Sequence, residues 1–304
     1  MIFKILIVDP IDEEAIRFLQ KKYHVLINLR PSREDFLNNI ADADVLIMRS
    51  GVTVDAEVLR AAKSLKVIAR AGIGLDNIDV KVANKKGIFV FRVPSQSSQS
   101  VAELCMGLIF SLMRKIPLAN TQVKSNIWKK SEMQGVELSG KTIGIIGLGD
   151  IGLKIARSSK LLGMNVIACV DHYSSLRKFL MRLKKIALVD LDVVIKKSHI
   201  IVVATPLNSN TRHMIDKHKF ELMKESPFVV NIARSEIINE DDLIAAIESN
   251  QIAGFATDVP HGEGCESKLA AYENVILTPH IGAMTCEAQK RIGDKVIHGI
   301  VNNL

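Results

Sequence analysis

The chain has 304 residues, of which 48% are hydrophobic and 24% are charged, and its formal net charge is +7. This length suits two domains, and the apolar content is sufficient for two cores. No apolar stretch reaches the roughly 18 residues of a membrane span, and the N-terminus lacks the basic head and cleavage site of a signal peptide. The four cysteines are widely separated, which argues against a disulfide framework or a zinc site. We therefore expect a cytoplasmic protein without a metal.

Much of the positive charge lies in the segment 177–185, which reads Arg-Lys-Phe-Leu-Met-Arg-Leu-Lys-Lys. A basic segment can bind nucleic acid, contact an anionic substrate or form a solvated surface. The apolar residues recur here at helical spacing, which favours an amphipathic surface helix. We accordingly expect no nucleic-acid or membrane partner, and nucleic-acid binding, if present, would depend steeply on salt.

The first part of the chain alternates short apolar strands with helical segments. We expect the strands near residues 3–8, 24–28, 44–48, 66–69 and 88–91. The sequence Ser100-Val101-Ala102-Glu103 has the form of a capping box, and it predicts a long helix that runs to about Lys115. The apolar residues of this helix, from Leu104 to Leu112, are expected to form a packing face between two domains.

A second alternation of strands and helices extends from Thr142 to Pro279. We expect its strands at 142–147, 165–170, 199–204, 227–232, 253–257 and 274–278. Strands that alternate with helices are typical of parallel sheets. The sequence thus predicts two Rossmann/flavodoxin-like doubly wound α/β domains with a cleft between them. The first would comprise residues 1–92 plus a closing helix within 285–304, and the second residues 93–284.

The motif Gly147-Leu-Gly149-Asp-Ile-Gly152 joins an expected strand to an expected helix. In a dinucleotide-binding turn, the first glycine permits the turn, the second lets the backbone approach a pyrophosphate, and the third allows close packing. Asp171 follows Gly152 by 19 residues, at the end of the next strand. A carboxylate at this place bonds the adenosine ribose hydroxyls, so the unit predicts NAD as the cofactor.

Three further segments extend the argument beyond the cofactor: Arg70 to Asp79, Val230 to Arg234, and Thr278 to Ala283. With Val101-Ala102-Glu103 and Thr205-Pro206-Leu207, they make the whole chain resemble the D-isomer-specific 2-hydroxyacid dehydrogenases. The resemblance implies a homodimer formed through the NAD-binding domain. It also implies a cofactor site made of Gly147, Gly149, Asp150, Ile151, Gly152, Asp171, Thr205, Pro206, Ala233, Asp258, His280 and Gly282.

Oxidation of a 2-hydroxy acid requires a base for the hydroxyl proton and a cation for the carboxylate. An imidazole exchanges a proton near neutral pH, and an arginine fork fits a carboxylate, so His280 and Arg234 are the candidates. The resemblance selects Glu263, five residues after Asp258, as the carboxylate that orients His280. The usual aromatic residue after Asp-Val and the proline after the glutamate are missing here, so Glu266 is the alternative.

The expected substrate site is basic. The resemblance places Arg49, Arg70 and Arg234 near the substrate, and it has the partner subunit supply Lys130. The sequence Gly72-Ile73-Gly74 is expected to turn backbone N–H groups toward the substrate carboxylate. We expect a phosphorylated 2-hydroxy acid. Three departures from close relatives are Arg92 and Ser97, which stand where asparagines are usual, and Ala204, which replaces a common histidine. Arg92 would either add a phosphate contact or block the site.

The resemblance is greatest to the branch that oxidises D-3-phosphoglycerate to 3-phosphohydroxypyruvate for serine synthesis. One alternative is a glyoxylate or hydroxypyruvate reductase that uses the same residues without a phosphate site. Another is a non-catalytic NAD-sensing protein like the corepressors that share this fold. Longer relatives carry a C-terminal serine-binding domain, and we expect none in a chain that ends at Leu304.

Overall fold

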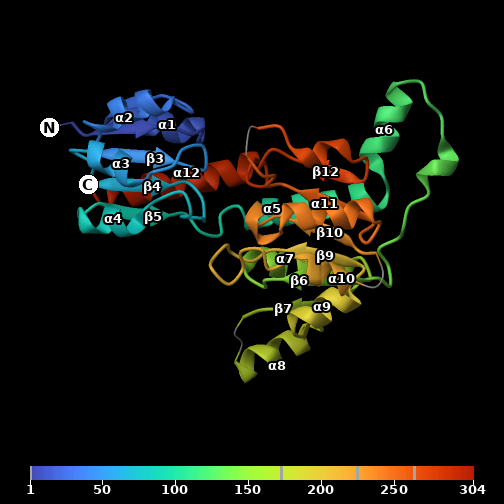
Figure 1. Ribbon diagram of the computed structural model, residues 1–304. Helices are drawn as coiled ribbons and strands as arrows, with labels where there is room; N and C mark the ends of the chain where they lie inside the picture. Colours follow the sequence, from blue (N-terminus) through green and yellow to red (C-terminus); the bar gives the residue numbers. More distant parts are fainter. Residues whose placement is uncertain (1, 172–173, 224–225, 263–264) are drawn as a thin grey trace. The chain divides into compact units, whose positions relative to one another are not determined.

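A computed structural model describes residues 2–171, 174–223, 226–262 and 265–304, and of Arg177 it describes the backbone only. The chain forms two compact units, Met1–Ser97 with Ala283–Leu304, and Ser98–Gly282. Each unit is a parallel sheet with helices packed on it (Figure 1). The expected fold class is therefore confirmed. Among the described residues, no helix combines the length and the apolar character needed to span a bilayer.

The first unit contains a five-stranded sheet in the order β2-β1-β3-β4-β5. Its strands are β1 (Lys4–Ile7), β2 (His24–Ile27), β3 (Val45–Met48), β4 (Val67–Arg70) and β5 (Phe89–Arg92). The strands β3 and β4 are buried along their whole length because helices cover both faces, as apolar Val/Ile runs predict. The strand order reverses between β1 and β3, and ligands of doubly wound sheets bind at such a point.

The helices of the first unit form one layer on each face of this sheet. The apolar cluster on one face includes residues of α2 (Arg33–Ile40), α3 (Ala56–Ala61) and α4 (Val80–Lys85). The cluster on the other face includes residues of α1 (Glu13–Gln20) and α12 (Cys286–Val301). Gly293 lets α12 approach α1 closely, because a Cβ there would lie 3.0 Å from the Cβ of Ala15.

The second unit contains a seven-stranded sheet in the order β12-β11-β10-β9-β6-β7-β8, with its order reversed between β6 and β9. The strands are β6 (Thr142–Ile146), β7 (Asn165–Cys169), β8 (Ala187–Leu188), β9 (Ile200–Val203), β10 (Phe228–Asn231), β11 (Gly254–Thr257) and β12 (Val275–Leu277). The helices are α5 (Ser98–Met113), α6 (Ile116–Lys124), η1 (Lys130–Met133), α7 (Asp150–Leu161), α8 (Ser175–Leu183), α9 (Leu191–Lys197), α10 (Lys217–Glu221), η2 (Ser235–Ile237), α11 (Glu240–Glu248) and η3 (Lys268–Ala271).

Helix α5 differs from the sequence prediction in two respects. It begins at Ser98, so Ser100 lies within its first turn and is buried, and the predicted capping box is wrong. Its apolar residues Leu108, Ile109 and Leu112 belong to the core of the second unit, where α5 packs on α7, β10 and β11. They do not form the expected layer between domains, because the sheet of this unit supplies enough apolar surface to bury them.

Candidate active site

In the turn between β6 and α7, close contacts with the backbone of this chain require glycine at two positions. Gly147 has φ +96°, and a Cβ on it would lie 2.6 Å from the carbonyl oxygen of Ala204. A Cβ on Gly152 would lie 2.2 Å from the carbonyl oxygen of Gly147. A Cβ on Gly149, by contrast, would meet no described atom within 4 Å. Gly149, the second glycine of the motif, thus leaves open space at the N-terminus of α7, where backbone N–H groups and the helix dipole favour a phosphate.

Two other segments of the expected cofactor site adjoin this turn. The N–H of Gly147 donates to the carbonyl of Cys169 at 3.0 Å, which places the end of β7, and exposed Asp171 after it, beside the turn. The N–H of Ala204 donates to Ile146 at 2.8 Å, and the Thr211 hydroxyl donates to the carbonyl of Pro206 at 2.8 Å. The loop with Thr205 and Pro206 is therefore held at the reversal of strand order. These residues fit a dinucleotide.

Arg234 lies on a turn after β10 that the side chain of Asn231 stabilises. The Asn231 Nδ2 donates to the carbonyl of Arg234 at 2.8 Å, and its Oδ1 accepts from the N–H of Ala233 at 3.0 Å. Asn231 is buried, and Arg234 is half-buried with its Nη1 2.7 Å from the carbonyl oxygen of Ala233. Sequence reasoning missed the role of Asn231. The signal was its place at the end of a buried strand.

Asp258 connects the end of β11 to the loop that carries His280. Its Oδ1 accepts from the Thr278 hydroxyl at 2.6 Å and from the N–H of Ile281 at 2.8 Å, and its Oδ2 accepts from the N–H of Gly282 at 2.7 Å. His280 is half-buried and has φ +54°, a conformation that non-glycine residues rarely adopt. Strained residues persist only where their surroundings hold them, and here the Asp258 carboxylate does so.

The strand register brings Arg234, Asp258 and His280 to one edge of the sheet. Asn231 of β10 is paired with Thr257 of β11, which is paired in turn with Leu277 of β12. The three candidate residues therefore follow three neighbouring parallel strands at their carboxyl ends.

Glu263, the expected orienting carboxylate, lies outside the described residues, and its alternative Glu266 is exposed. His261, earlier in the same loop, has its Nε2 4.0 Å from the Oε2 of Glu240. Both atoms are buried beside a small cavity lined in part by Asn231 and Pro260. The start of this loop is therefore packed against the first turn of α11.

In the first unit, Arg49 follows β3 at the reversal of strand order. The carboxylate of buried Asp9 accepts from the N–H groups of Arg49 and Gly51, and the Nδ2 of Asn77 donates to the carbonyls of Arg49 and Val52 at 2.8 and 2.7 Å. Burial lowers the pKa of the Arg49 guanidinium, the Asp9 charge opposes this, and the group stays protonated at neutral pH. Asp9 and Asn77 are site residues that sequence reasoning missed.

Arg70 and Arg92 add two more cationic side chains at the carboxyl ends of the strands next to β3. Met48, Arg70 and Arg92 end three neighbouring strands, and the register pairs Arg70 with both of the others. Arg70 is buried, whereas Arg92 is exposed, with its Nη1 3.4 Å from the carbonyl oxygen of Ile73. Arg92 therefore lies beside the expected carboxylate site. Ser97, the second position at which the resemblance leads us to expect an asparagine, is buried.

The segment Gly72-Ile73-Gly74 has only part of the expected arrangement. A Cβ on Gly72 would lie 2.1 Å from the Nη1 of Arg70, so this glycine makes room for the guanidinium. Its N–H donates to the carbonyl of Arg70 at 2.8 Å and is thus used within the chain. The prediction that Gly72 turns its N–H toward a substrate is therefore wrong. Ile73 and Gly74 remain the candidate backbone donors to the substrate carboxylate.

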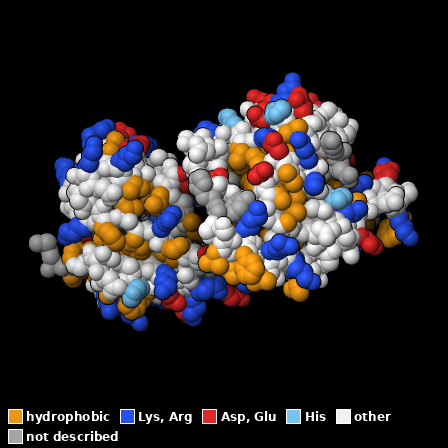
Figure 2. Space-filling model, turned by 90° about the horizontal axis from the view of Figure 1, so that it is seen from below, with side chains coloured by type: hydrophobic (Ala, Val, Ile, Leu, Met, Phe, Trp, Pro, Cys, Tyr) orange, Lys and Arg blue, Asp and Glu red, His pale blue; other side chains and the backbone are white. Residues whose placement is uncertain are grey.

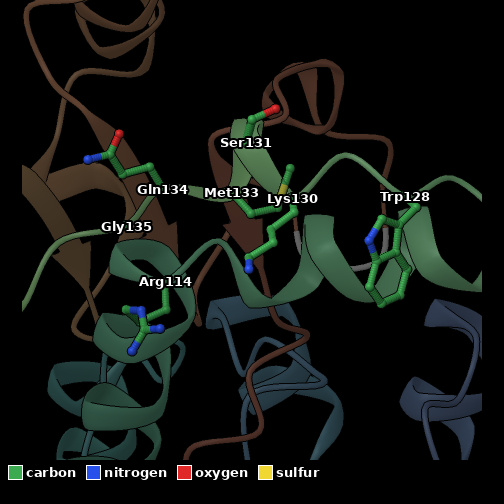
Figure 3. Close-up of a pocket in the computed structure, with 7 residues that line it drawn as sticks. All are labelled: Arg114, Trp128, Lys130, Ser131, Met133, Gln134 and Gly135. Carbon is green, nitrogen blue, oxygen red and sulfur yellow. The ribbon is translucent and has the colours of Figure 1, made fainter.

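Lys130 lies in a separate segment of the second unit, here called the arm (residues 114–137). It lines a broad surface hollow with Arg114, Trp128, Ser131, Met133, Gln134 and Gly135. In Figure 3, the side chains of Lys130 and Trp128 extend from the arm in the same direction, downward in the view. Trp128 is 80% exposed. The arm therefore presents an aromatic ring and an ammonium group together on its surface.

Comparison with known proteins identifies the family of the chain. Residues 106–282 match the family described as D-isomer specific 2-hydroxyacid dehydrogenase, NAD binding domain. The chain belongs to this family. It is 42% identical over 299 residues to a D-3-phosphoglycerate dehydrogenase of Methanocaldococcus jannaschii, covering 98% of this chain and 56% of that protein. It therefore spans little more than half the length of that relative.

Two further proteins are similar over nearly their whole length. A hydroxypyruvate reductase of Thermotoga maritima is 38% identical over 307 residues, which are 99% of this chain and 98% of that one. A crystal structure of D-lactate dehydrogenase from Aquifex aeolicus with NAD and lactic acid has a TM-score of 0.86 and 26% identity, with 98% of this chain and 94% of that chain covered.

Proposed function

We propose that the chain oxidises D-3-phosphoglycerate to 3-phosphohydroxypyruvate with NAD. The observation that carries this substrate is the row formed by Arg49, Arg70 and Arg92 at the carboxyl ends of three neighbouring strands. A substrate with a carboxylate at one end and a phosphate at the other needs more cations than a simple hydroxy acid, and arginine forks suit both anions. The name of the M. jannaschii relative supports the same substrate.

The proposed reaction removes a hydride from C2 and a proton from the C2 hydroxyl. NAD, when bound, accepts the hydride. We assign the proton to His280, since an imidazole exchanges protons near neutral pH, and the orienting role to Glu263. Arg234 holds the substrate carboxylate and, in the reverse direction, polarises the carbonyl. The N–H groups of Ile73 and Gly74 are the proposed backbone donors to the same carboxylate.

We assign the cofactor to the reversal of strand order in the second unit. Gly149 and the backbone N–H groups of Asp150 and Ile151, at the N-terminus of α7, would hold the pyrophosphate. Asp171 accepts from the ribose hydroxyls, and the loop with Thr205 and Pro206 lines the cofactor. A carboxylate has about four acceptor sites, so Asp258 can hold the His280 loop and also accept from the nicotinamide carboxamide, next to Ala233 and Gly282.

The experiment that tests this function compares kcat/KM for 3-phosphohydroxypyruvate, hydroxypyruvate and glyoxylate with NADH. Two charge-assisted contacts to the phosphate, each worth about 1.5–3 kcal/mol, predict a preference of roughly 10²–10⁴ for the phosphorylated ketoacid. Equal rates with hydroxypyruvate would replace this proposal by the reductase. NADH binding without turnover of any ketoacid would instead favour a non-catalytic NAD-sensing protein.

A second candidate is hydroxypyruvate reduction. The observation that favours it is the T. maritima relative, which matches this chain along almost the full length of both. In that case the cations at the edge of the first sheet would hold only one carboxylate. The same kinetic comparison decides between the two candidates.

We propose that the arm forms a homodimer. Helix α6 buries none of its own residues, and Ile116, Val123, Ile127 and Trp128 are all exposed. Such a run of apolar side chains indicates an interface. In a dimer, Lys130 would reach the substrate of the partner subunit. We expect Val123→Asp with Trp128→Ala to give monomers by light scattering, whereas Leu161→Asp, at a residue that is 90% exposed on α7, leaves the dimer intact.

We infer a cytoplasmic location from the cysteines. All four are free, as expected in a reducing compartment. Among the described residues, no cluster of three metal-binding side chains occurs.

A further inference from the structure

Helix α8 directs its apolar side to solvent. Leu176, Phe179 and Leu183 are 66%, 57% and 65% exposed, and Leu180 is exposed as well. Their spacing places them on one stripe along the helix. Met181 is the one buried residue among the described side chains of α8, and at about 100° per residue it lies on the opposite side from Phe179 and Leu183. The predicted surface helix is thus confirmed, but its apolar stripe does not face the core.

Cationic side chains accompany this stripe. Lys178 and Arg182 are one helical turn apart, between the stripe and the side of Met181, and Lys184 and Lys185 follow the helix directly. All four residues are exposed. Figure 2 views the molecule from the side where α8 lies in Figure 1, and it shows apolar side chains there with Lys and Arg side chains next to them. We call the stripe and these four cations the α8 face.

The arrangement excludes a second copy of this face as its occupant. In a symmetric dimer the same patch meets itself, so two α8 faces would bring eight cations together. Like charges at such short range repel, and desolvating them adds to the cost. The occupant must therefore offer an apolar part to the stripe and anionic groups beside it.

We propose that the α8 face binds the surface of a membrane that contains anionic phospholipids. A helix that lies in a membrane interface has Leu and Phe on one side, which enter the acyl boundary, and Lys or Arg beside them, which reach the phosphates. The α8 face has this order. The helix also packs on β8, the edge strand at one end of the seven-stranded sheet (Figure 1).

A membrane fits the α8 face better than two other anionic partners. Nucleic acid offers phosphates, but its backbone has no apolar counterpart for Phe179 and the three leucines. An acidic protein helix would need a second apolar stripe and acids at matching positions, whereas a lipid layer supplies both an apolar interior and anionic headgroups without a fixed register. The membrane proposal concerns surface binding and is independent of the proposed catalytic function.

The test is sedimentation of the intact protein with vesicles of phosphatidylcholine alone or of phosphatidylcholine mixed with an equal part of phosphatidylglycerol. We expect binding to the mixed vesicles and not to the neutral ones, and we expect it to weaken as salt is raised, because salt screens the cations. Absence of binding to the mixed vesicles at low salt would overturn the proposal. So would binding of an acidic amphipathic peptide in place of the vesicles.

Two variants separate the apolar and the charged contributions. Phe179→Gln with Leu183→Gln should weaken vesicle binding by about 100-fold or more, because two large apolar side chains no longer enter the lipid. Arg182→Gln with Lys184→Gln should weaken it by about 25-fold, at about fivefold for each cation. Lys81→Gln with Lys85→Gln, on exposed positions of α4, is the matched charge control and should bind as the original protein does.

All variants should keep the circular dichroism spectrum and the midpoint of thermal unfolding of the original protein, which shows that they fold. If the Phe179→Gln, Leu183→Gln variant binds the mixed vesicles as tightly as the original protein, the contact is electrostatic only and the α8 face is not a membrane-binding site. If the control pair weakens binding as much as Arg182→Gln with Lys184→Gln does, the overall charge of the protein explains the binding and the assignment to α8 is also overturned.

Discussion

The carboxylate of Asp258 accepts a 2.6 Å hydrogen bond from the hydroxyl of Thr278. The same carboxylate accepts from two backbone N–H groups, those of Ile281 and Gly282, so it is bonded on both sides of His280. Because the Asp258 side chain is buried, these bonds form in a setting where charge-assisted contacts are strong. The conformation of the His280 loop therefore depends on one side chain of the neighbouring strand.

Replacing Asp258 by asparagine should misplace His280. The amide turns an NH₂ group toward donors that need an acceptor, and a buried donor left unsatisfied costs about 1–3 kcal/mol. We expect a lower midpoint of thermal unfolding and a kcat reduced at least tenfold, measured by calorimetry and steady-state kinetics. Asp241→Asn, on the exposed surface of α11, is the control and should change neither. Unchanged kcat in Asp258→Asn would show that the His280 loop does not need this carboxylate.

His280→Asn tests the proposed proton transfer. Asparagine tolerates the left-handed backbone conformation seen at this residue better than alanine does, so the loop should be preserved. A positioned acid or base typically contributes about 10²–10⁴ to the rate, and we expect kcat to fall by that amount while the Kd of NADH, measured by fluorescence, stays nearly constant. A loss below tenfold would assign the proton to another group.

The sequence predicted the strands and the glycine turn well because both depend on local chemistry. Apolar runs specify buried parallel strands, and Gly147 and Gly152 are fixed by contacts within one βαβ unit. The bracing residues Asp9, Asn77 and Asn231 were not predicted. Their partners lie in turns whose conformation is decided only when neighbouring strands align, and an aspartate or asparagine after a strand is equally common in a turn without such a role.

The sequence predicted where the helices lie along the chain, but it did not always predict what the apolar side of a helix faces. The periodicity of 177–185 indicates a helix and cannot tell whether its apolar side faces the core or the solvent. In α8 the adjoining core is already filled by residues such as Ile186 and Leu188, so Met181 alone is needed for packing. Helix α5 likewise shows that an apolar stripe does not specify which part of the protein packs on it.

The choice between NAD and NADP should depend on Asp171. In the proposed site, its exposed carboxylate would accept from the ribose hydroxyls of NAD but would repel a 2′-phosphate. We expect a higher kcat/KM with NADH than with NADPH, and we expect Asp171→Ala to narrow the ratio mainly by weakening NADH. Arg177 follows Asp171 by six residues in the sequence, and an arginine next to the 2′ position would favour NADP, so Arg177 is the residue to change next. A wild-type preference for NADPH would contradict the assignment of Asp171.

The cysteines should differ in reactivity in a way that follows from burial. Burial raises the pKa of the Cys169 thiol to about 11 and raises that of Cys105 as well, whereas Cys265 and Cys286 are exposed. Only a thiolate reacts with a disulfide reagent, and its fraction falls about tenfold for each pH unit below the pKa. At pH 8 we expect rapid labelling of Cys265 and Cys286 and slow labelling of the other two, measured by mass spectrometry. Rapid labelling of Cys105 in the folded protein would contradict its burial.

Arg92 and Arg49 should have separable effects on substrate phosphate recognition. If Arg92 contacts the phosphate, Arg92→Asn, which restores the residue usual in close relatives, should raise KM for 3-phosphohydroxypyruvate about 10- to 100-fold, since a charge-assisted contact is worth about 1.5–3 kcal/mol. The phosphate makes no bond to the reacting carbon, so kcat should change little, and KM in the unmodified protein should rise with salt.

Arg49→Ala is the variant to compare with Arg92→Asn. The side chains of Asp9 and Asn77 bond the backbone of Arg49, so the loop should keep its conformation when the arginine side chain is removed. We expect both variants to lose preference for the phosphorylated ketoacid while kcat/KM for hydroxypyruvate stays within about threefold, which is well below the value of one charge-assisted contact. A gain of activity on 3-phosphohydroxypyruvate in Arg92→Asn would show instead that Arg92 blocks the phosphate site. Because Arg92 ends a strand paired with that of Arg70, the guanidinium would then compete with substrate for the same edge of the sheet, and the reductase would become the better description of the chain.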